Sequence, residues 1–268
     1  MPEGHSILRY ARRQHELLAG QEVMAASPQG RFQGGAARIS GRELLEVDAH
    51  GKHLFYHWHR AETLHVHLGL YGKFRTFKTD PPPPTPATRL TLSTERVTVY
   101  LAGPTVCELI TPSQEEAIRA RLGPDPLQAG SDGNTLAEFA SNLKRRQVPI
   151  GAAILDQKVI AGIGNIYRTE ILFLTGINPA TRANELELGK VEELWRCSVD
   201  LLARGVAAGK IVTVPRTPLG RSNETDRLYA YKRERFPCRL CGGSISKADM
   251  ANRAIWWCES CQPGRAVY

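Results

Sequence analysis

The chain has 268 residues, of which 42% are hydrophobic and 23% charged, the composition of a globular protein with room for two modest domains. It has no apolar run of the roughly 18 residues that cross a bilayer, and no basic segment leads into an apolar one at the start, so we expect a cytoplasmic protein and no membrane partner. The formal net charge is +8. Residues 1–134 hold 15 Lys+Arg against 14 Asp+Glu, and residues 135–268 hold 20 against 13. A basic second half favours a polyanionic partner, because Lys and Arg that neutralise phosphates release counterions, although a solvated basic face has the same signature.

The first half is predicted to be rich in strands after a single helix. Ile7, Leu8, Ala11 and His15 recur at helical spacing and predict a helix over residues 5–18. Stretches rich in β-branched and aromatic residues, with period-2 alternation, predict strands within residues 53–60, 63–77, 87–102 and 105–111. The proline run at residues 80–88 interrupts them and indicates an exposed loop.

The second half is predicted to be helical. It follows a segment dense in Gly, Pro and Asp, which indicates an interdomain linker over residues 122–134. Helices are predicted over residues 135–146, 148–156, 164–174 and 186–208, with Thr135 and Asn184 as helix starts. The expected organisation is a β-rich domain (1–121), the linker, a helical domain (135–235) and a cysteine-containing module of short strands (236–268).

Four cysteines near the C-terminus have the spacing C-x2-C-x16-C-x2-C: Cys238, Cys241, Cys258 and Cys261. Each C-x2-C pair places two sulfurs at one turn, and two such turns complete the tetrahedron of a structural zinc site. Two disulfides are the alternative, which an intracellular location disfavours. Because protein sulfurs take all four positions, we expect one structural zinc ion, whose binding supplies the folding free energy of the module. Cys107 and Cys197 are left over as free, buried thiols.

Arg253 lies between the two cysteine pairs, at the base of the expected hairpin. Its guanidinium can hold a phosphate with a rigid fork of donors. It can equally cover Trp256 or Trp257 by stacking, and the local sequence leaves both interpretations open.

The eight histidines all lie within the first 67 residues, and six of them fall between His50 and His67. In extended strands, His57 shares a face with His59, and His65 shares a face with His67. Since no matching carboxylate pattern accompanies these strands, we expect contacts with phosphates rather than a metal site.

Six motifs, in order along the chain, resemble the formamidopyrimidine-DNA glycosylase and endonuclease VIII family of base-excision repair enzymes. They are MPEG at the start, HGKHLF (50–55), HLGLYG (67–72), LGPDPL (122–127), LDQKVIAGIGNIYRTEILF (155–173) and the four-cysteine module with Arg253. The fifth, which resembles the family's helix–two-turn–helix, is the most specific. The resemblance implies an α+β fold: an N-terminal antiparallel β-sandwich with a flanking helix, then a helical helix–two-turn–helix domain carrying a four-cysteine zinc-finger hairpin.

The resemblance implies that Met1 is removed and that Pro2 is the nucleophile. An N-terminal amine titrates near ~8, below the ~10.4 of lysine, so more of it is neutral at neutral pH. Its attack on the sugar C1′ would leave a charged iminium that permits β- and then δ-elimination of the two phosphates. Glu3 would be the general acid–base carboxylate. Ser6 stands where many members carry a glutamate.

Further roles in binding the DNA backbone follow from the same resemblance. Lys52 would bind a phosphate and assist elimination, although an exposed turn lysine is the plain alternative. His67, Asn165 and Arg253 would contact phosphates, and Arg253 counts with the catalytic set. Gly162 and Gly164, beside Asn165, let backbone amides approach a phosphate closely.

The branch of the family is predicted from the residues that would enter the duplex. Leu70 and Tyr71 would fill the space left by a flipped-out nucleotide, whereas Gly69 stands where endonuclease VIII members often have a larger polar residue. Residues 101–110 lack the Arg–Phe pair with which formamidopyrimidine glycosylases hold the orphaned base, and Gly151 replaces a lysine usual in that branch. Both departures favour the endonuclease VIII side. The family's lesion-covering loop would fall near residues 217–236.

We therefore expect a monomeric glycosylase and AP lyase that removes oxidised bases, pyrimidines above all, from damaged duplex DNA and also from single-stranded or bubble DNA. One alternative is a formamidopyrimidine-type glycosylase that acts mainly on oxidised purines. The other is a zinc-dependent DNA-binding protein without catalysis, which would apply if Met1 were retained, because the nitrogen of Pro2 would then be an amide.

Overall fold

The computed structural model describes residues 2–59, 62–78, 80–215 and 223–264. The chain divides into two compact units, Met1–Arg121 (unit 1) and Leu122–Tyr268 (unit 2). Among the described residues, no helix is long and apolar enough to cross a membrane.

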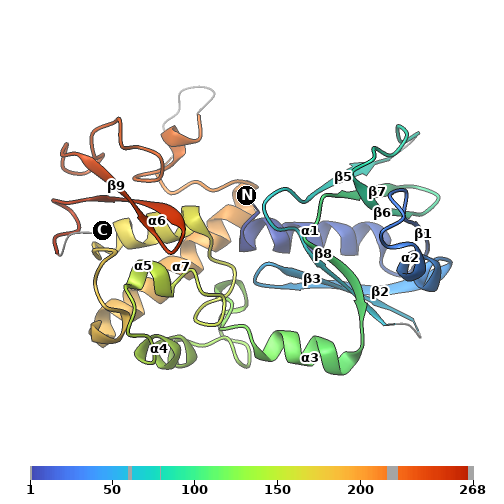
Figure 1. Cartoon of the computed structure of the whole chain (residues 1–268), viewed down its shortest axis with the longest axis horizontal. Helices are drawn as coiled ribbons and strands as arrows, with labels where there is room; N and C mark the ends of the chain where they lie inside the picture. Colours follow the sequence, from blue (N-terminus) through green and yellow to red (C-terminus); the bar gives the residue numbers. More distant parts are fainter. Residues whose placement is uncertain (1, 60–61, 79, 216–222, 265–268) are drawn as a thin grey trace. The chain divides into compact units, whose positions relative to one another are not determined.

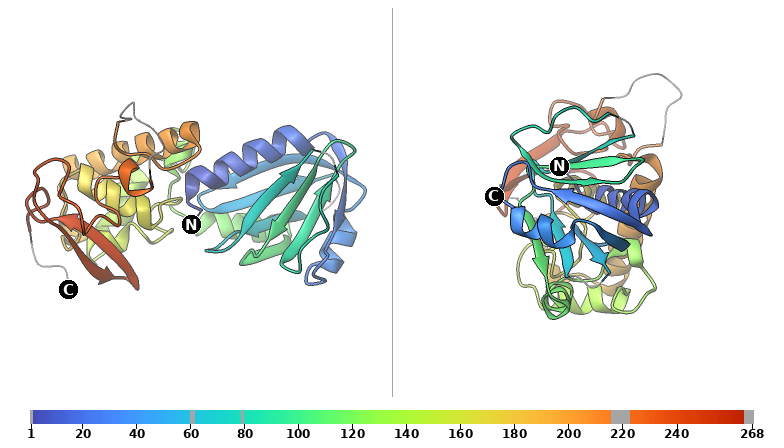
Figure 2. Two further views of the ribbon diagram at one scale, coloured as in Figure 1. Left: turned by 90° about the horizontal axis from the view of Figure 1, so that it is seen from above. Right: turned by 90° about the vertical axis from the view of Figure 1, so that its right-hand side faces the viewer.

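Unit 1 is built on an antiparallel sheet with the strand order β5-β7-β6-β1-β2-β3-β4-β8 (Figures 1 and 2). Strand β1 pairs with β2 through Gln21–Val23 and with β6 through Met24–Ala26, so one strand belongs to both halves of the sheet. Apolar side chains from both halves meet in one hydrophobic core. The elements of unit 1 are α1 (Gly4–Leu18), β1 (Gln21–Ala26), α2 (Gln33–Ile39), β2 (Arg42–His50), β3 (His53–Trp58), β4 (Thr63–His67), β5 (Lys73–Phe77), β6 (Thr88–Ser93), β7 (Thr98–Ala102), β8 (Val106–Ile110) and α3 (Pro112–Ala120).

Helix α1 is the flanking helix that the sequence predicts. Its buried stripe includes Ile7, Ala11 and Leu18, which pack with the inward side chains of β2 and β3. The hydroxyl of Tyr56 donates a 2.8 Å hydrogen bond to the side-chain oxygen of Gln14 and ties the helix to β3. Because neighbouring strand residues point to opposite faces, Phe55 is directed to the other side of the sheet.

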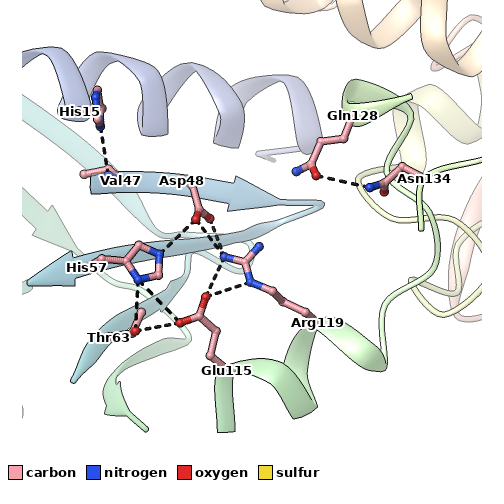
Figure 3. Close-up of polar contacts among 9 residues, drawn as sticks. All are labelled: His15, Val47, Asp48, His57, Thr63, Glu115, Arg119, Gln128 and Asn134. Atoms are coloured by element: carbon pink, nitrogen blue, oxygen red, sulfur yellow. Dashed lines mark hydrogen bonds and ion pairs between the residues drawn. The ribbon is translucent and has the colours of Figure 1, made fainter. Parts of the chain in front are cut away.

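Helix α3 covers that other side and was not predicted. Its start carried a signal, since Thr111 and Gln114 form a capping box and Pro112 is the first helical residue. Arg119 fastens the helix to β2, with Nη2 2.7 Å from Asp48 Oδ1 (Figure 3). Ile118 packs with Phe55 and with Ile110 of β8.

The strands predicted from period-2 alternation are found, but two of the predicted stretches are each divided into two strands. The stretch 87–102 forms β6 and β7. The stretch 63–77 forms two strands, β4 and β5, because the chain turns at Gly69, which has φ +64°. Strands β1 and β2 and the short helix α2 were missed.

Unit 2 is mainly helical and ends in a hairpin. Its elements are η1 (Pro126–Gln128), α4 (Leu136–Lys144), α5 (Ile150–Ala153), α6 (Asn165–Leu174), η2 (Ala183–Glu185), α7 (Leu188–Ala208), η3 (Thr225–Arg227), β9 (Ile245–Met250) and β10 (Arg253–Cys258). Thr135 caps α4 as predicted, by accepting a hydrogen bond from the Glu138 amide. The prediction of Asn184 as a helix start is wrong, because Asn184 lies in η2 and Glu187 precedes α7.

Helix α6 is the centre of unit 2. Every residue from Asn165 to Phe173 is buried, since the helix packs against α7 on one side and β10 on another (Figure 1). The hydrophobic core continues from these helices into Ile255, Trp256 and Trp257 of the hairpin. The hairpin is thus held to the helices by a shared core.

The segment 122–134 is partly buried within unit 2. Residues 123–126 are buried, and the carboxylate of Asp125 accepts a 2.9 Å hydrogen bond from the Leu127 amide. A Cβ on Gly123 would lie 2.6 Å from the backbone of Val159. This close approach of two backbones accounts for glycine at that position.

Candidate functional site

The N-terminus leads directly into α1. Glu3 is the N-cap residue and is fully buried, with 0% of its surface exposed, and its carbonyl oxygen accepts a 2.8 Å hydrogen bond from the Ser6 amide. Pro2 is partly exposed. Glu3 is therefore fixed at the start of α1, and its carboxylate is shielded from water.

His5 lies two residues further on, and the sequence had not singled it out. It is buried, and its Nε2 is 3.0 Å from the hydroxyl oxygen of Ser6. Burial, helped by the charge of Arg9, lowers the pKa of His5 to about 4. At neutral pH the buried imidazole of His5 is therefore uncharged.

Lys52 and His67 are brought together by the pairing of β3 with β4. Lys52 lies in the tight turn between β2 and β3, where Gly51 has φ +58°, and the next residue, His53, is paired directly with His67. Burial, followed by the positive charge of Lys52, lowers the pKa of His67. Both side chains are partly exposed, so this corner of the sheet can meet an anion.

Leu70 and Tyr71 project from the turn after β4. Leu70 is 53% exposed and Tyr71 is 85% exposed, so both residues are accessible to a partner. The turn is closed by a 3.0 Å bond from the Gly72 amide to the Leu68 carbonyl. At Gly69 a Cβ would lie 1.9 Å from the Thr105 hydroxyl oxygen, which explains the absence of a larger polar residue there.

The four cysteines of the C-terminal module converge. One ligand atom from each lies within 4.8 Å of the others, with Cys238 Sγ 3.8 Å from Cys261 Sγ and Cys241 Sγ 3.4 Å from Cys258 Sγ. Four thiolates around zinc at ~2.3 Å stand about 3.8 Å apart, so the cluster fits a tetrahedral ion. The amides of Leu240 and Gly243 point at sulfurs, as expected of knuckles that hold thiolates.

Arg253 begins β10, and here the expectation needs correction. It pairs with Met250 across the two-residue turn Ala251–Asn252, whose φ values are +54° and +59°. It therefore lies at the tip of the hairpin, because the cysteines occupy the opposite, open end. The side chain is exposed, and the cation over Trp256 is Lys247, 5.7 Å from the ring centroid.

Arg168, which the sequence had not singled out, connects Asn165 with the hairpin. It is fully buried, and Nη2 donates to the Asn165 side-chain oxygen at 2.5 Å and to the Ala254 carbonyl at 2.9 Å. The Asn165 amide nitrogen also donates to the Ala254 carbonyl, at 2.9 Å. That nitrogen has two hydrogens, so it can bind a further acceptor while it holds the hairpin.

Gly151 also lies where the helices of unit 2 pack against the hairpin. A Cβ there would lie 2.7 Å from Met250 Sδ and 3.1 Å from Ile255 Cδ1, and its carbonyl accepts from Arg168 at 3.2 Å. A side chain at this position would require at least the side chain of Met250 to move, so glycine fits the packing of this chain.

Glu170 holds the segment that precedes the cysteine module. Its buried carboxylate accepts hydrogen bonds of 2.7–2.9 Å from the amides of residues 229–231. The expected lesion-covering loop falls in part on residues 216–222, which lie outside the described residues.

The remaining cysteines are free thiols. Burial raises the pKa of Cys107 and of Cys197 to about 12, so neither is a nucleophile at neutral pH.

A second group of metal-capable side chains occurs among the described residues: Asp48, His57 and Glu115. Arg119 already pairs with both carboxylates, at 2.7 Å from Asp48 and 2.8 Å from Glu115 (Figure 3). The Arg119 guanidinium thus already supplies the positive charge in this cluster. We interpret the cluster as a salt-bridge network that anchors α3.

Sequence comparison decides the family. Residues 1–105 match the formamidopyrimidine-DNA glycosylase N-terminal domain, and residues 122–216 match the formamidopyrimidine-DNA glycosylase H2TH domain. The chain belongs to this family. Its members are DNA glycosylases of base-excision repair, and the resemblance inferred from the six motifs is confirmed.

Individual relatives of the family extend over the whole chain. Endonuclease 8 1 of Mycobacterium tuberculosis is 41% identical over 98% of this chain and 100% of its own length. Formamidopyrimidine-DNA glycosylase of Thermus thermophilus is 32% identical over 98% of both chains, and endonuclease 8 of Escherichia coli is 28% identical over 98% of this chain and 100% of its own.

The fold agrees with that of solved family structures. A Lactococcus lactis formamidopyrimidine-DNA glycosylase in complex with DNA superposes with a TM-score of 0.83, at 23% identity, over 98% of this chain and 100% of that chain. The expected α+β architecture of an N-terminal antiparallel sheet, C-terminal helices and a four-cysteine cluster is confirmed.

Proposed function

We propose that this DNA glycosylase is bifunctional, and that it removes oxidised bases and then cuts the strand through a covalent intermediate on Pro2. The observation that carries the proposal is the start of the chain, where Pro2 precedes a fully buried Glu3 at the N-cap of α1. Family membership of both units supports it.

The chemistry begins when Met1 is removed and Pro2 becomes a secondary amine. The neutral amine attacks the sugar C1′, the bond from C1′ to the damaged base breaks, and the base leaves with a proton. Loss of the amine proton and opening of the sugar ring give an iminium. Its positive charge acidifies the C2′ proton, so β-elimination expels the 3′-phosphate and δ-elimination the 5′-phosphate. Hydrolysis of the iminium then frees Pro2.

Glu3 is the proposed acid–base group. Its buried position supports transfer of a proton to the departing base or the sugar ring oxygen, and later acceptance of one during elimination. Lys52 is proposed to bind a phosphate and to assist the elimination steps. Its placement beside His67, at a partly exposed corner of unit 1, supports this assignment.

We assign contacts with the phosphates of the damaged strand to two residues of unit 2. Asn165 and Arg253 are linked through the Ala254 carbonyl and Arg168, so they can act as one phosphate-binding element. A zinc ion in the four-cysteine cluster would fix the open end of the hairpin whose tip carries Arg253. Damaged DNA is thus the partner.

Oxidised pyrimidines are the proposed preferred substrates. Leu70 and Tyr71 are exposed and can fill the gap in the stack, but neither can read the opposite base by bidentate hydrogen bonds. Residues 101–110 offer no arginine for that purpose. Weak dependence on the opposite base and tolerance of single-stranded or bubble DNA follow.

Several broader assignments belong to the same proposal. We assign the domains to residues 1–121, 135–235 and 236–268, with 122–134 between the first two. We place the enzyme in the cytoplasm with chromosomal DNA, acting as a monomer.

Borohydride trapping tests the covalent step. The mature protein should form an adduct with DNA that contains an abasic site, Pro2→Gly should form less, and a form that retains Met1 should form none. Intact mass establishes which form is present. Equal trapping with Met1 retained would overturn the role of Pro2 and leave a DNA-binding protein as the alternative.

A matched panel of lesions tests the substrate preference. Under single-turnover conditions, we expect thymine glycol and dihydrouracil to be excised faster than 8-oxoguanine opposite cytosine, with little effect of the opposite base. Faster excision of 8-oxoguanine, with strong dependence on the opposite base, would favour the purine-specific alternative.

A further inference from the structure

A line of hydrogen bonds crosses the face of unit 1 that carries Lys52 and His67. His65 Nδ1 lies 3.0 Å from Glu108 Oε1, and His65 Nε2 lies 2.8 Å from His53 Nδ1. Strand register makes this possible, since β4 pairs His65 with Glu108 of β8 and His67 with His53 of β3. The line therefore ends beside His67.

The direction of each bond in this line follows from the chemistry of its ends. A carboxylate only accepts, so His65 Nδ1 carries the hydrogen that Glu108 receives. A neutral imidazole has a single N–H, so His65 Nε2 is an acceptor and His53 Nδ1 must donate to it. His53 Nε2 is then an acceptor as well. Both rings are fixed as Nδ1–H tautomers, a choice set by their hydrogen bonds.

The neutral state of both rings is consistent with their surroundings. His65 is 4% exposed, and burial lowers its pKa although Glu108 opposes the shift. Burial, followed by the proximity of other basic side chains, lowers the pKa of His53 to about 3. The groups that act on the two rings come from β2, β4, β8, α3 and the residue after α3: His50, His67, Glu108, Glu115 and Arg121.

The rings are also stacked. The planes of His53 and His65 differ by 12° with centroids 5.1 Å apart, and Phe55 continues the stack at 5.3 Å from His65. The Arg119 guanidinium lies 4.0 Å from the Phe55 centroid, held there by Asp48 and Glu115 (Figure 3). At the other end, the rings of His53 and His67 are 4.8 Å apart. His67 thus packs against the ring of His53, which cannot rotate without breaking its hydrogen bond to His65.

We propose that Glu108 and His65 are positioning residues, which lock His53 as its Nδ1–H tautomer so that the ring of His53 holds His67 in the orientation that meets a phosphate. The inference rests on the proposed function for the role of His67, but the tautomer lock exists without DNA. It adds Glu108 and His65, which would act through His53 and His67, to the residues on which DNA binding depends.

Nuclear magnetic resonance tests the lock on the free protein. Long-range 1H–15N correlation at pH 7.5 should show His53 and His65 as Nδ1–H tautomers, assigned by loss of signals in His53→Phe and His65→Phe. Glu108→Ala should release His65 to the Nε2–H form, and Glu95→Ala, which removes an exposed carboxylate in the β6–β7 turn, should not. An Nε2–H form of His65 in the wild type would overturn the lock.

A double-mutant cycle tests the action through His67. With duplex DNA that holds an abasic-site analogue, Glu108→Ala should raise Kd by about threefold or more, and have almost no effect in a His67→Ala background, as for contacting pairs. His65→Phe, which keeps the stacked ring, should behave like Glu108→Ala. Equal losses in both backgrounds would overturn the proposal. Thermal unfolding of each variant checks that the fold is retained.

Failure of this inference differs from failure of the proposed function. If the wild type forms no borohydride adduct, the covalent mechanism fails whatever the tautomers. If trapping succeeds but His67→Ala leaves Kd unchanged, the covalent function stands and the positioning inference falls.

Discussion

Two regions of the molecule carry the side chains that are proposed to contact phosphates, and they are held in place by different means. In unit 1, Lys52 and His67 lie on a sheet in which β2, β3, β4 and β8 pair in succession, so strand register sets their positions. In unit 2, Arg253 lies at the tip of a hairpin of two strands. A two-stranded hairpin has little stability of its own.

Because its two strands give little stability, the hairpin depends on contacts other than strand pairing. The hairpin is fixed by four sulfurs at its open end and by the buried Arg168, which donates to the carbonyls of Met250 and Ala254 near its tip. The sheet of unit 1, which carries Lys52 and His67, is held by strand pairing and contains no part of the four-cysteine cluster. Under the proposed function, loss of zinc from the four-cysteine cluster should therefore disable phosphate binding by the hairpin and spare the sheet face of unit 1.

Metal removal gives the largest expected effect on this comparison. Chelation of zinc, or Cys241→Ser, should abolish specific DNA binding while unit 1 stays folded, because only the hairpin relies on the four thiolates. Gel-shift assays measure binding, and near-ultraviolet circular dichroism with limited proteolysis follows unit 1. Cys107→Ser is the matched control, since that thiol is remote from the cluster in sequence and belongs to unit 1. Full affinity after metal loss would show that the hairpin is dispensable.

Removal of a single cation from the hairpin tip should have a smaller effect. Arg253→Ala should cost about 1.5–3 kcal/mol of binding, or about 10- to 150-fold in Kd, the range for a charge-assisted hydrogen bond. It should also reduce the salt slope of log K by about one phosphate contact. Arg235→Ala, which removes the same charge from another exposed arginine of unit 2, should cost less. Identical losses would mean that only net charge matters.

The network under α3 should give the smallest effect, because the sheet of unit 1 has many other supports. The hydrogen bond that His57 donates to the Asp48 carboxylate raises the pKa of His57, so this contribution to stability is complete below pH 6.5 and is lost as the pH rises through the folded pKa. Burial raises the pKa of Asp48, but hydrogen bonds from His57 and Arg119 outweigh it and leave the value lowered. Stability from Asp48 is therefore lost only in acid.

Urea unfolding of the wild type and of His57→Gln measures that contribution. The difference between them should be below about 1 kcal/mol at pH 5.5, the range for partly exposed ion pairs, and should shrink at pH 8.5. A difference that grows with pH would contradict the assigned direction.

Much of the architecture could be predicted from the sequence because its signals are local. Period-2 alternation identified the strands from β3 to β8, and the cysteine spacing identified a cluster whose four sulfurs converge. Helix α3 was missed although Pro112 and Thr111 mark its start, because nine residues with a single buried side chain carry a weak periodic signal. Strands β1 and β2 were missed for a related reason, since their polar residues conceal the alternation.

The interior of the candidate site could not be predicted in the same way. The contacts of Arg168 join residues more than 80 positions apart, and the line from Glu108 to His53 crosses three strands. The tip position of Arg253 depends on a two-residue turn with positive φ at Ala251 and Asn252. Asn adopts this conformation readily, but Ala rarely does. Such features depend on which strands are neighbours, and a single sequence does not contain that information.

The contact between Gly69 and Thr105 has a consequence for the thermodynamics of base flipping. The turn that carries Leu70 and Tyr71 is closed at Gly72, backed by the Thr105 hydroxyl, and joined to β8 through the bond from the Thr105 amide to the His67 carbonyl, 2.9 Å long. Its backbone is therefore ordered before any DNA arrives. Under the proposed function, insertion of Leu70 and Tyr71 into the duplex would cost side-chain rotamer entropy but little backbone entropy. The backbone entropy of this turn is lost when the protein folds, before DNA binds.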